Sequence, residues 1–162
     1  MTESPKRRVR TPSRCRKIVV RGSGYNLRLW GDESDPPLLM LHGTRDSSIT
    51  FQFVIEELRQ KWHVIAPDWR GHGHSEWVNR GYWFHEFVAD LNALVDRIAP
   101  DHSIPIVGHG LGGNIASVFA SLRPAKVASL VLLDASGPAV GSIPIDIASV
   151  LEAYLREDVP DL

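Results

Sequence analysis

Val107-Gly108-His109-Gly110-Leu111-Gly112-Gly113 is the stretch that decides how the rest of this sequence is interpreted. The apolar run Ile104–Val107 leads into it and predicts a strand. An apolar face at helical spacing follows it and predicts a helix; this face consists of Ile115, Val118, Phe119 and Leu122. A tight turn from strand to helix brings the two elements close together, which explains small residues at Gly108 and Gly112.

The same stretch has the layout of a nucleophile elbow, G-x-S-x-G, in which a serine occupies a sharp turn with a strained backbone. Gly110 stands at the serine position. Glycine adopts a positive φ without strain but has no oxygen to attack a carbonyl. We therefore expect an intact turn without its nucleophile. Ser103 and Ser117 lie too far along the chain to replace the serine, and His109 is expected to pack or to form hydrogen bonds.

Strands and helices alternate along the rest of the chain. The unbroken apolar segment Leu38–Leu41 is typical of a strand buried on both faces in a parallel sheet. The pattern predicts an α/β, three-layer sandwich with a mostly parallel sheet. The expected strands are 17–21, 26–30, 38–41, 64–66, 104–107 and 127–133. The other expected helices are 49–59, capped by Asp46, Ser47 or Ser48, 84–99 and 147–156.

Two further segments follow predicted strands at the carboxyl edge of the sheet, where open α/β sheets bind ligands. They are Leu41-His42-Gly43-Thr44 and Asp68-Trp69-Arg70-Gly71-His72-Gly73-His74-Ser75. With these motifs in this order, the chain from about Lys17 to Gly137 resembles the α/β-hydrolase family, in particular its bacterial ester hydrolases. The resemblance implies a truncated α/β-hydrolase fold with about six of eight strands. It divides the chain into a basic disordered tail (1–16), a partial core (17–140) and the start of a lid (141–162).

The resemblance also implies a site at the elbow. Backbone N–H groups of Thr44 and Leu111 would form an oxyanion hole, where each donor stabilises the transition state by about 3–4 kcal/mol. His42, Gly43, Gly108, His109 and Gly112 would support it. Asp134 is either the acid in a variant placement or an aspartate that caps a loop. The family's base histidine comes late in the chain, but no histidine follows His109.

Three functions remain open from the sequence. The first is a serine-ester-hydrolase-like protein that is inactive or incomplete as written. The second is a non-catalytic module that binds a small ester or carbonyl ligand. The third is a hydrolase with a non-serine route, through a metal or the substrate itself. The pair His72 and His74 has a spacing that zinc sites use, but this loop occurs in the family without metal, so we expect no metal and no cofactor.

Charge and composition limit the partners and the compartment. Segment 1–17 contains seven basic residues and one acidic residue, Glu3. The rest of the chain has a net charge of −7. This acidic body offers no basic stripe for nucleic acid. Cys15 is the only cysteine, and the sequence shows neither a secretory signal nor an apolar run long enough to span a membrane, so we expect a cytoplasmic protein. The unbroken apolar run 127–133 predicts another buried strand, but as the last strand of the predicted sheet it would leave an open apolar edge and favour self-association.

Overall fold

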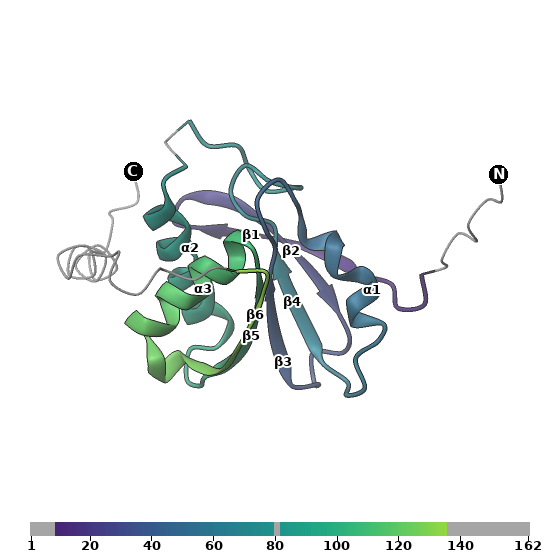
Figure 1. The fold of residues 1–162 in the computed structure, drawn as a ribbon. Coiled ribbons are helices and arrows are strands. Elements are labelled where there is room, and N and C mark those ends of the chain that lie inside the picture. The colour runs from purple at the N-terminus through teal and green to yellow at the C-terminus, as the bar shows by residue number, and fades with distance from the viewer. Residues whose placement is uncertain (1–8, 80–81, 136–162) are drawn as a thin grey trace.

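A twisted six-stranded sheet forms the centre of the computed structural model, which describes residues 9–79 and 82–135 (Figure 1). The spatial order is β1-β2-β4-β3-β5-β6. The strands are β1 (Arg14–Val20), β2 (Ser23–Trp30), β3 (Pro37–Leu41), β4 (His63–Pro67), β5 (Ile104–His109) and β6 (Val127–Leu133). β1 and β2 form an antiparallel hairpin, β2 pairs antiparallel with β4, and the remaining pairings are parallel. The predicted α/β class with a mostly parallel sheet is confirmed.

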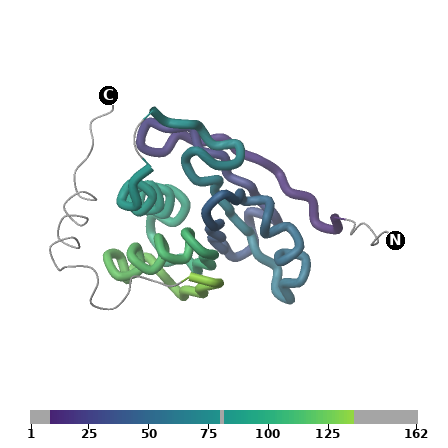
Figure 2. The backbone as a smooth tube through the Cα atoms, turned by 45° about the horizontal axis from the view of Figure 1, so that its top comes forward, coloured from purple at the N-terminus to yellow at the C-terminus, as the bar shows by residue number. Residues whose placement is uncertain are grey.

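Helices cover both faces of this sheet, as Figures 1 and 2 show. They are α1 (Gln52–Ile55), α2 (Phe84–Ile98) and α3 (Leu111–Leu122), with 3-10 turns at Ser48–Phe51 and Pro124–Lys126. α2 and α3 lie side by side over the larger apolar core, and α1 lies over a smaller apolar cluster on the opposite face. In the described part of the chain, no helix is both long and apolar enough to cross a lipid bilayer.

The helix predicted over 49–59 is wrong in length and in its cap. A 3-10 turn precedes α1, and the Ser47 side chain forms no capping hydrogen bond. After α1, the N–H of Glu57 bonds to the carbonyl of Val54 three residues earlier, which tightens the backbone and ends the helix. Ile49 and Phe53 are exposed, so the apolar residues here do not form the single buried stripe that a longer amphipathic helix needs.

β1 begins at Arg14, three residues before the strand predicted at Lys17 and inside the segment expected to be a tail. The backbone of Arg14 pairs with Leu29, and the side chains of Arg14 and Arg16 both bind Glu33. Pairing with β2 thus accounts for the earlier start. Residues 1–8, the last residues of the predicted core and the predicted lid with its helix 147–156 lie outside the described residues.

β6 has the predicted bounds but not the burial first expected for an unbroken apolar strand. Val131, Leu132 and Leu133 are 49%, 42% and 39% exposed. Within the described residues β6 pairs with β5 on one side and with no strand on the other. The strand is therefore an apolar edge rather than a buried strand.

Candidate active site

The elbow joins β5 to α3 through Gly110, whose φ of 51° and ψ of −118° lie outside the range that side chains favour. The Gly110 N–H donates to the carbonyl of Leu133 at 3.0 Å, and the Gly110 carbonyl accepts from the N–H of Asn114 at 3.1 Å. The turn is therefore fixed to β6 on one side and to the first turn of α3 on the other.

Close backbone packing explains the glycines around this turn. A Cβ on Gly108 would lie 2.5 Å from the Cα of Gly113, and a Cβ on Gly112 would lie 2.4 Å from the carbonyl oxygen of Leu41. Both distances are shorter than atoms can approach. Gly108 and Gly112 therefore allow α3 to begin directly against β5 and β3.

Gly110 differs from these neighbours because space is available beside it. The atom nearest to a Cβ on Gly110 would be the Cα of Gly43, at 3.5 Å, which is ordinary van der Waals contact. A serine side chain would begin without a clash here. The elbow thus retains room for a nucleophile that the sequence does not supply.

His42 is buried and connects the end of β3 to the end of β4 through hydrogen bonds. Its Nδ1 lies 2.8 Å from the carbonyl of Gly43, and its Nε2 accepts the backbone N–H of Trp69 at 3.0 Å. Trp69 in turn donates its indole N–H to the His42 carbonyl at 3.0 Å. Burial lowers the pKa of His42 below its ordinary value. Both ring nitrogens are occupied, so His42 holds the Gly43 loop in place rather than acting as a free base.

Asp68 fixes the loop that follows β4. Its carboxylate accepts backbone N–H groups of Ser48 at 2.7 Å and His74 at 2.9 Å, and the side-chain amide of Asn26 at 2.9 Å. Burial alone would raise the pKa of Asp68, but these hydrogen bonds together hold it below its usual value. The carboxylate stays charged and ties β2, the start of the 3-10 turn and the loop together.

A buried ionic network ties the same loop to α2. Arg70 donates from Nε and Nη2 to the two carboxylate oxygens of Asp90, at 2.6 and 2.7 Å. Tyr25 also donates its hydroxyl to Asp90, and burial together with the charge of Asp90 raises the pKa of Tyr25. Arg21 and Glu86 extend the network at its partly exposed end. Sequence reasoning missed this network, although Asp90 was the signal: it is an acid among the apolar residues of an amphipathic helix.

A pocket of about 350 Å³ opens at this edge of the sheet. It brings together the HG segment, the loop after β4, the start of α2 and the start of α3. Its lining residues are Thr44, Gly71, His72, Trp77, Tyr82, Phe84, Phe87 and Leu111. Two of the predicted site residues, Thr44 and Leu111, thus meet at one pocket. In the described part of the chain, neither of their backbone N–H groups has a hydrogen-bond partner.

Two other predicted site residues do not line this pocket. The imidazole of His109 lies against Gly43, with its Nδ1 3.1 Å from where a Cβ on that glycine would be. Asp134 follows β6 with a φ of 48°, is exposed, and forms no hydrogen bond with the other described residues. Over residues 9–79 and 82–135, no group of three or more His, Cys, Asp or Glu side chains could hold a metal ion.

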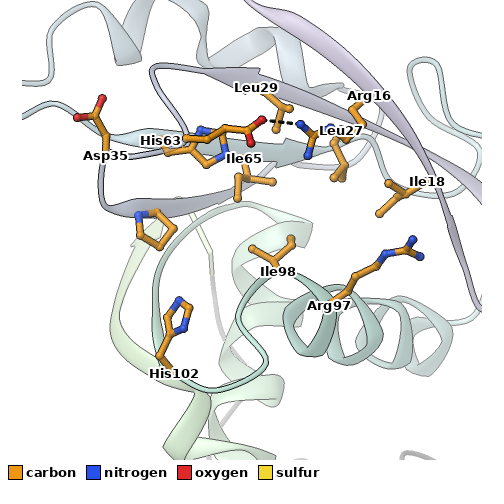
Figure 3. Close-up of a pocket in the computed structure, with 12 residues that line it drawn as sticks. Arg16, Ile18, Leu27, Leu29, Asp35, His63, Ile65, Arg97, Ile98 and His102 are labelled. Atoms are coloured by element: carbon orange, nitrogen blue, oxygen red, sulfur yellow. Dashed lines mark hydrogen bonds and ion pairs between the residues drawn. The ribbon is translucent and has the colours of Figure 1, made fainter.

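A second cavity, of about 430 Å³, lies at the opposite end of the parallel strands, where β3 and β4 begin (Figure 3). Figure 3 shows Ile65 of the sheet facing Ile98 of α2, with Arg97 and His102 at its margin. None of the elbow residues lines it. The pocket lined by Thr44 and by Leu111, the residue after Gly110, is therefore the candidate active site.

Comparison with known proteins agrees with this geometry. The sequence profile described as alpha/beta hydrolase fold matches residues 36–161. The chain belongs to the α/β-hydrolase fold family. A serine hydrolase-like protein from Danio rerio is 38% identical over 112 residues, which cover 68% of this chain and 34% of that protein. A serine hydrolase-like protein from Homo sapiens is 32% identical over 120 residues, which cover 73% of this chain and 59% of that protein.

Among solved structures, the thioesterase domain from the curacin biosynthetic pathway matches this α/β-hydrolase chain with a TM-score of 0.73 at 28% identity. The match covers 89% of this chain and 54% of that domain. The chain therefore spans less than two thirds of the length of each of these relatives, and the residues that match the family profile include the elbow.

Proposed function

We propose that this α/β-hydrolase chain binds a small carbonyl compound, such as an ester, in the pocket beside the elbow without forming a serine acyl-enzyme. The observation that carries the proposal is Gly110. Its backbone has the geometry of the turn that holds a nucleophile, yet the residue has no side chain. The similarity to a thioesterase domain and to serine hydrolase-like proteins supports a carbonyl compound as the ligand.

The pocket has hydrogen-bond donors for a carbonyl oxygen. Thr44 and Leu111 line it, and Leu111 is the first residue of α3, where the helix dipole favours negative charge. A carbonyl oxygen bound between them would satisfy two donors that lack partners in the described chain. We assign these two groups as the oxyanion-type donors of the site.

The opposite wall of the pocket is aromatic and suits the apolar part of an ester. Trp77, Tyr82, Phe84 and Phe87 form it. Apolar walls with a few well-placed polar groups are typical of small-molecule sites, whose volumes begin at about 300 Å³. The pocket therefore fits an aryl or short alkyl ester better than a long-chain lipid.

The binding part of the proposal is tested with methyl benzoate and isothermal titration calorimetry. We expect Trp77→Ala to weaken binding about fivefold, because the loss of one aromatic contact costs on the order of 1 kcal/mol. Trp83→Ala is the matched control, since Trp83 is similarly exposed (68%, against 76% for Trp77) but does not line the pocket. Equal effects of the two variants, or no binding to the unmodified chain, would contradict the proposed site.

The covalent part is tested with a fluorophosphonate probe followed by intact-mass measurement and peptide mapping. We expect no serine adduct on the unmodified chain, because none of the residues that line the pocket is a serine. A stoichiometric adduct on any serine would show that another residue has taken over the nucleophile's role, and would overturn this part of the proposal.

A further inference from the structure

His72 lines the pocket, and one contact fixes the hydrogen-bonding role of each of its ring nitrogens. Its Nδ1 lies 2.9 Å from the backbone carbonyl oxygen of Arg70. A carbonyl oxygen can only accept, so Nδ1 carries the proton in this contact. In the neutral ring Nε2 then has a lone pair and is an acceptor.

The His72 ring is held in this orientation by its surroundings. The Arg70 guanidinium is bound to Asp90 by two hydrogen bonds, which fixes the backbone that supplies the carbonyl. The backbone N–H of His72 donates to the backbone carbonyl of Trp69 at 2.9 Å. The ring lies against that of His42, with centroids 5.4 Å apart, and His42 uses both of its nitrogens elsewhere. In the part of the chain that the structure describes, Nε2 of His72 has no partner.

The pocket therefore offers two kinds of polar contact on separate elements. Thr44 of the HG segment and Leu111 of α3 line the pocket, and within the described residues their backbone N–H groups have no partner. His72, in the loop after β4, also lines the pocket and has an acceptor nitrogen that Arg70 leaves available. An ester satisfies only the donors. A carboxamide with an N–H satisfies both, because its carbonyl oxygen accepts while its nitrogen donates.

We propose that His72 is a specificity-determining residue that accepts a hydrogen bond from the N–H of a carboxamide ligand bound in the elbow pocket. This inference rests on the proposed function, because it takes the elbow pocket as the binding site. It adds the ligand class: primary or secondary carboxamides with an aryl or short alkyl group against the aromatic wall.

The test compares benzamide with N,N-dimethylbenzamide, which has the same carbonyl and ring but no N–H. Dissociation constants are measured by calorimetry on the unmodified chain and on His72→Asn, which keeps a donor for the Arg70 carbonyl but has no atom at the Nε2 position. We expect His72→Asn to weaken benzamide binding about tenfold, the effect of one lost hydrogen bond. Binding of N,N-dimethylbenzamide should stay within about twofold, a margin well below that loss.

Two further variants distinguish the loss of the hydrogen-bond acceptor at residue 72 from a general disturbance of the loop. His72→Gln can place an amide oxygen near the Nε2 position and should restore most of the benzamide affinity. His74→Asn is the matched control, because His74 lies two residues along the same loop, is exposed and does not line the pocket. A wild-type measurement needs no variant: the ¹⁵N resonance of the His72 Nε2 should shift with benzamide and not with N,N-dimethylbenzamide.

The possible outcomes distinguish a failure of the His72 role from a failure of the proposed function on which it rests. If methyl benzoate binding depends on Trp77 but His72→Asn affects the two amides equally, the pocket stands and the role of His72 is overturned. An unchanged Nε2 resonance on benzamide binding overturns it as well. If neither methyl benzoate nor the amides bind, both the pocket and the role of His72 are overturned.

Discussion

At the scale of single residues, Gly110 and Gly112 are close in the sequence but differ in what confines them. Gly110 has a positive φ and free space beside it, whereas Gly112 lies against the carbonyl of Leu41. We expect Gly110→Ala to lower the free energy of unfolding by about 1–2 kcal/mol, the cost of a side chain in a left-handed backbone. Gly112→Ala should cost at least about 3 kcal/mol, because helix and strand must separate to admit the methyl group.

Urea denaturation of the two variants measures this difference, with the unmodified chain as reference. If Gly110→Ala is as destabilising as Gly112→Ala, the elbow does not have the free space described above. The comparison matters for function, because a tolerated Gly110→Ala indicates that the turn can accept a larger residue such as serine without loss of the fold.

The elbow glycines also show what sequence reasoning can and cannot reach at this scale. The spacing of Gly108, Gly110 and Gly112 between a strand and a helix was enough to predict the turn, because tight turns restrict residue choice locally. The position of His109 against Gly43 was not predictable, since it depends on how β3 and β5 lie beside each other. The partners of Asp90 were missed for the same reason: they come from three separate elements.

At the scale of elements, the ion pairs of α2 include the buried pair of Asp90 with Arg70 and the more exposed pair of Asp96 with Arg123, which can be compared directly. Asp90 is fully buried and bound to Arg70, whereas Asp96 pairs with Arg123 where their side chains are 44% and 34% exposed. Asp90→Asn leaves the Arg70 charge poorly compensated, so we expect a loss of about 3–5 kcal/mol in the free energy of unfolding. Asp96→Asn should cost less than about 1 kcal/mol, as is usual for exposed pairs.

Thermal and urea unfolding of the two variants measure the contrast, and benzamide binding gives a second measurement. Asp90→Asn should also weaken benzamide binding, because Arg70 fixes the carbonyl that orients His72. Equal stability losses for the two variants would mean that the network does not hold the loop to α2. The long helix itself was predictable from its apolar period, but the short α1 was not, since its apolar residues Phe53 and Val54 are exposed and its buried residue is the polar Gln52.

At the scale of the whole molecule, the described residues leave the β6 edge of the sheet without a pairing strand. Strong local patterns predicted the parallel part of the sheet, because apolar runs alternate there with amphipathic helices. The exposure of β6 is a property of the whole sheet: it depends on which strand is last, and the apolar character of the strand alone suggested burial. An unpaired apolar strand is a template for pairing with another chain.

We therefore expect the purified chain to self-associate through β6, and Val131→Lys to reduce this association. A charged side chain on an edge strand opposes pairing, since it would have to be buried in the new sheet. Ile49→Lys is the matched control, because Ile49 is equally exposed (47%, against 49% for Val131) but lies in the 3-10 turn before α1. Sedimentation velocity over a range of protein concentrations measures the effect. A monomer at every concentration, or an equal response to both substitutions, would mean that the open edge is not an association surface. A selective effect of Val131→Lys would place the contact on β6. This is the same edge at which the Leu133 carbonyl accepts the N–H of Gly110 in the elbow.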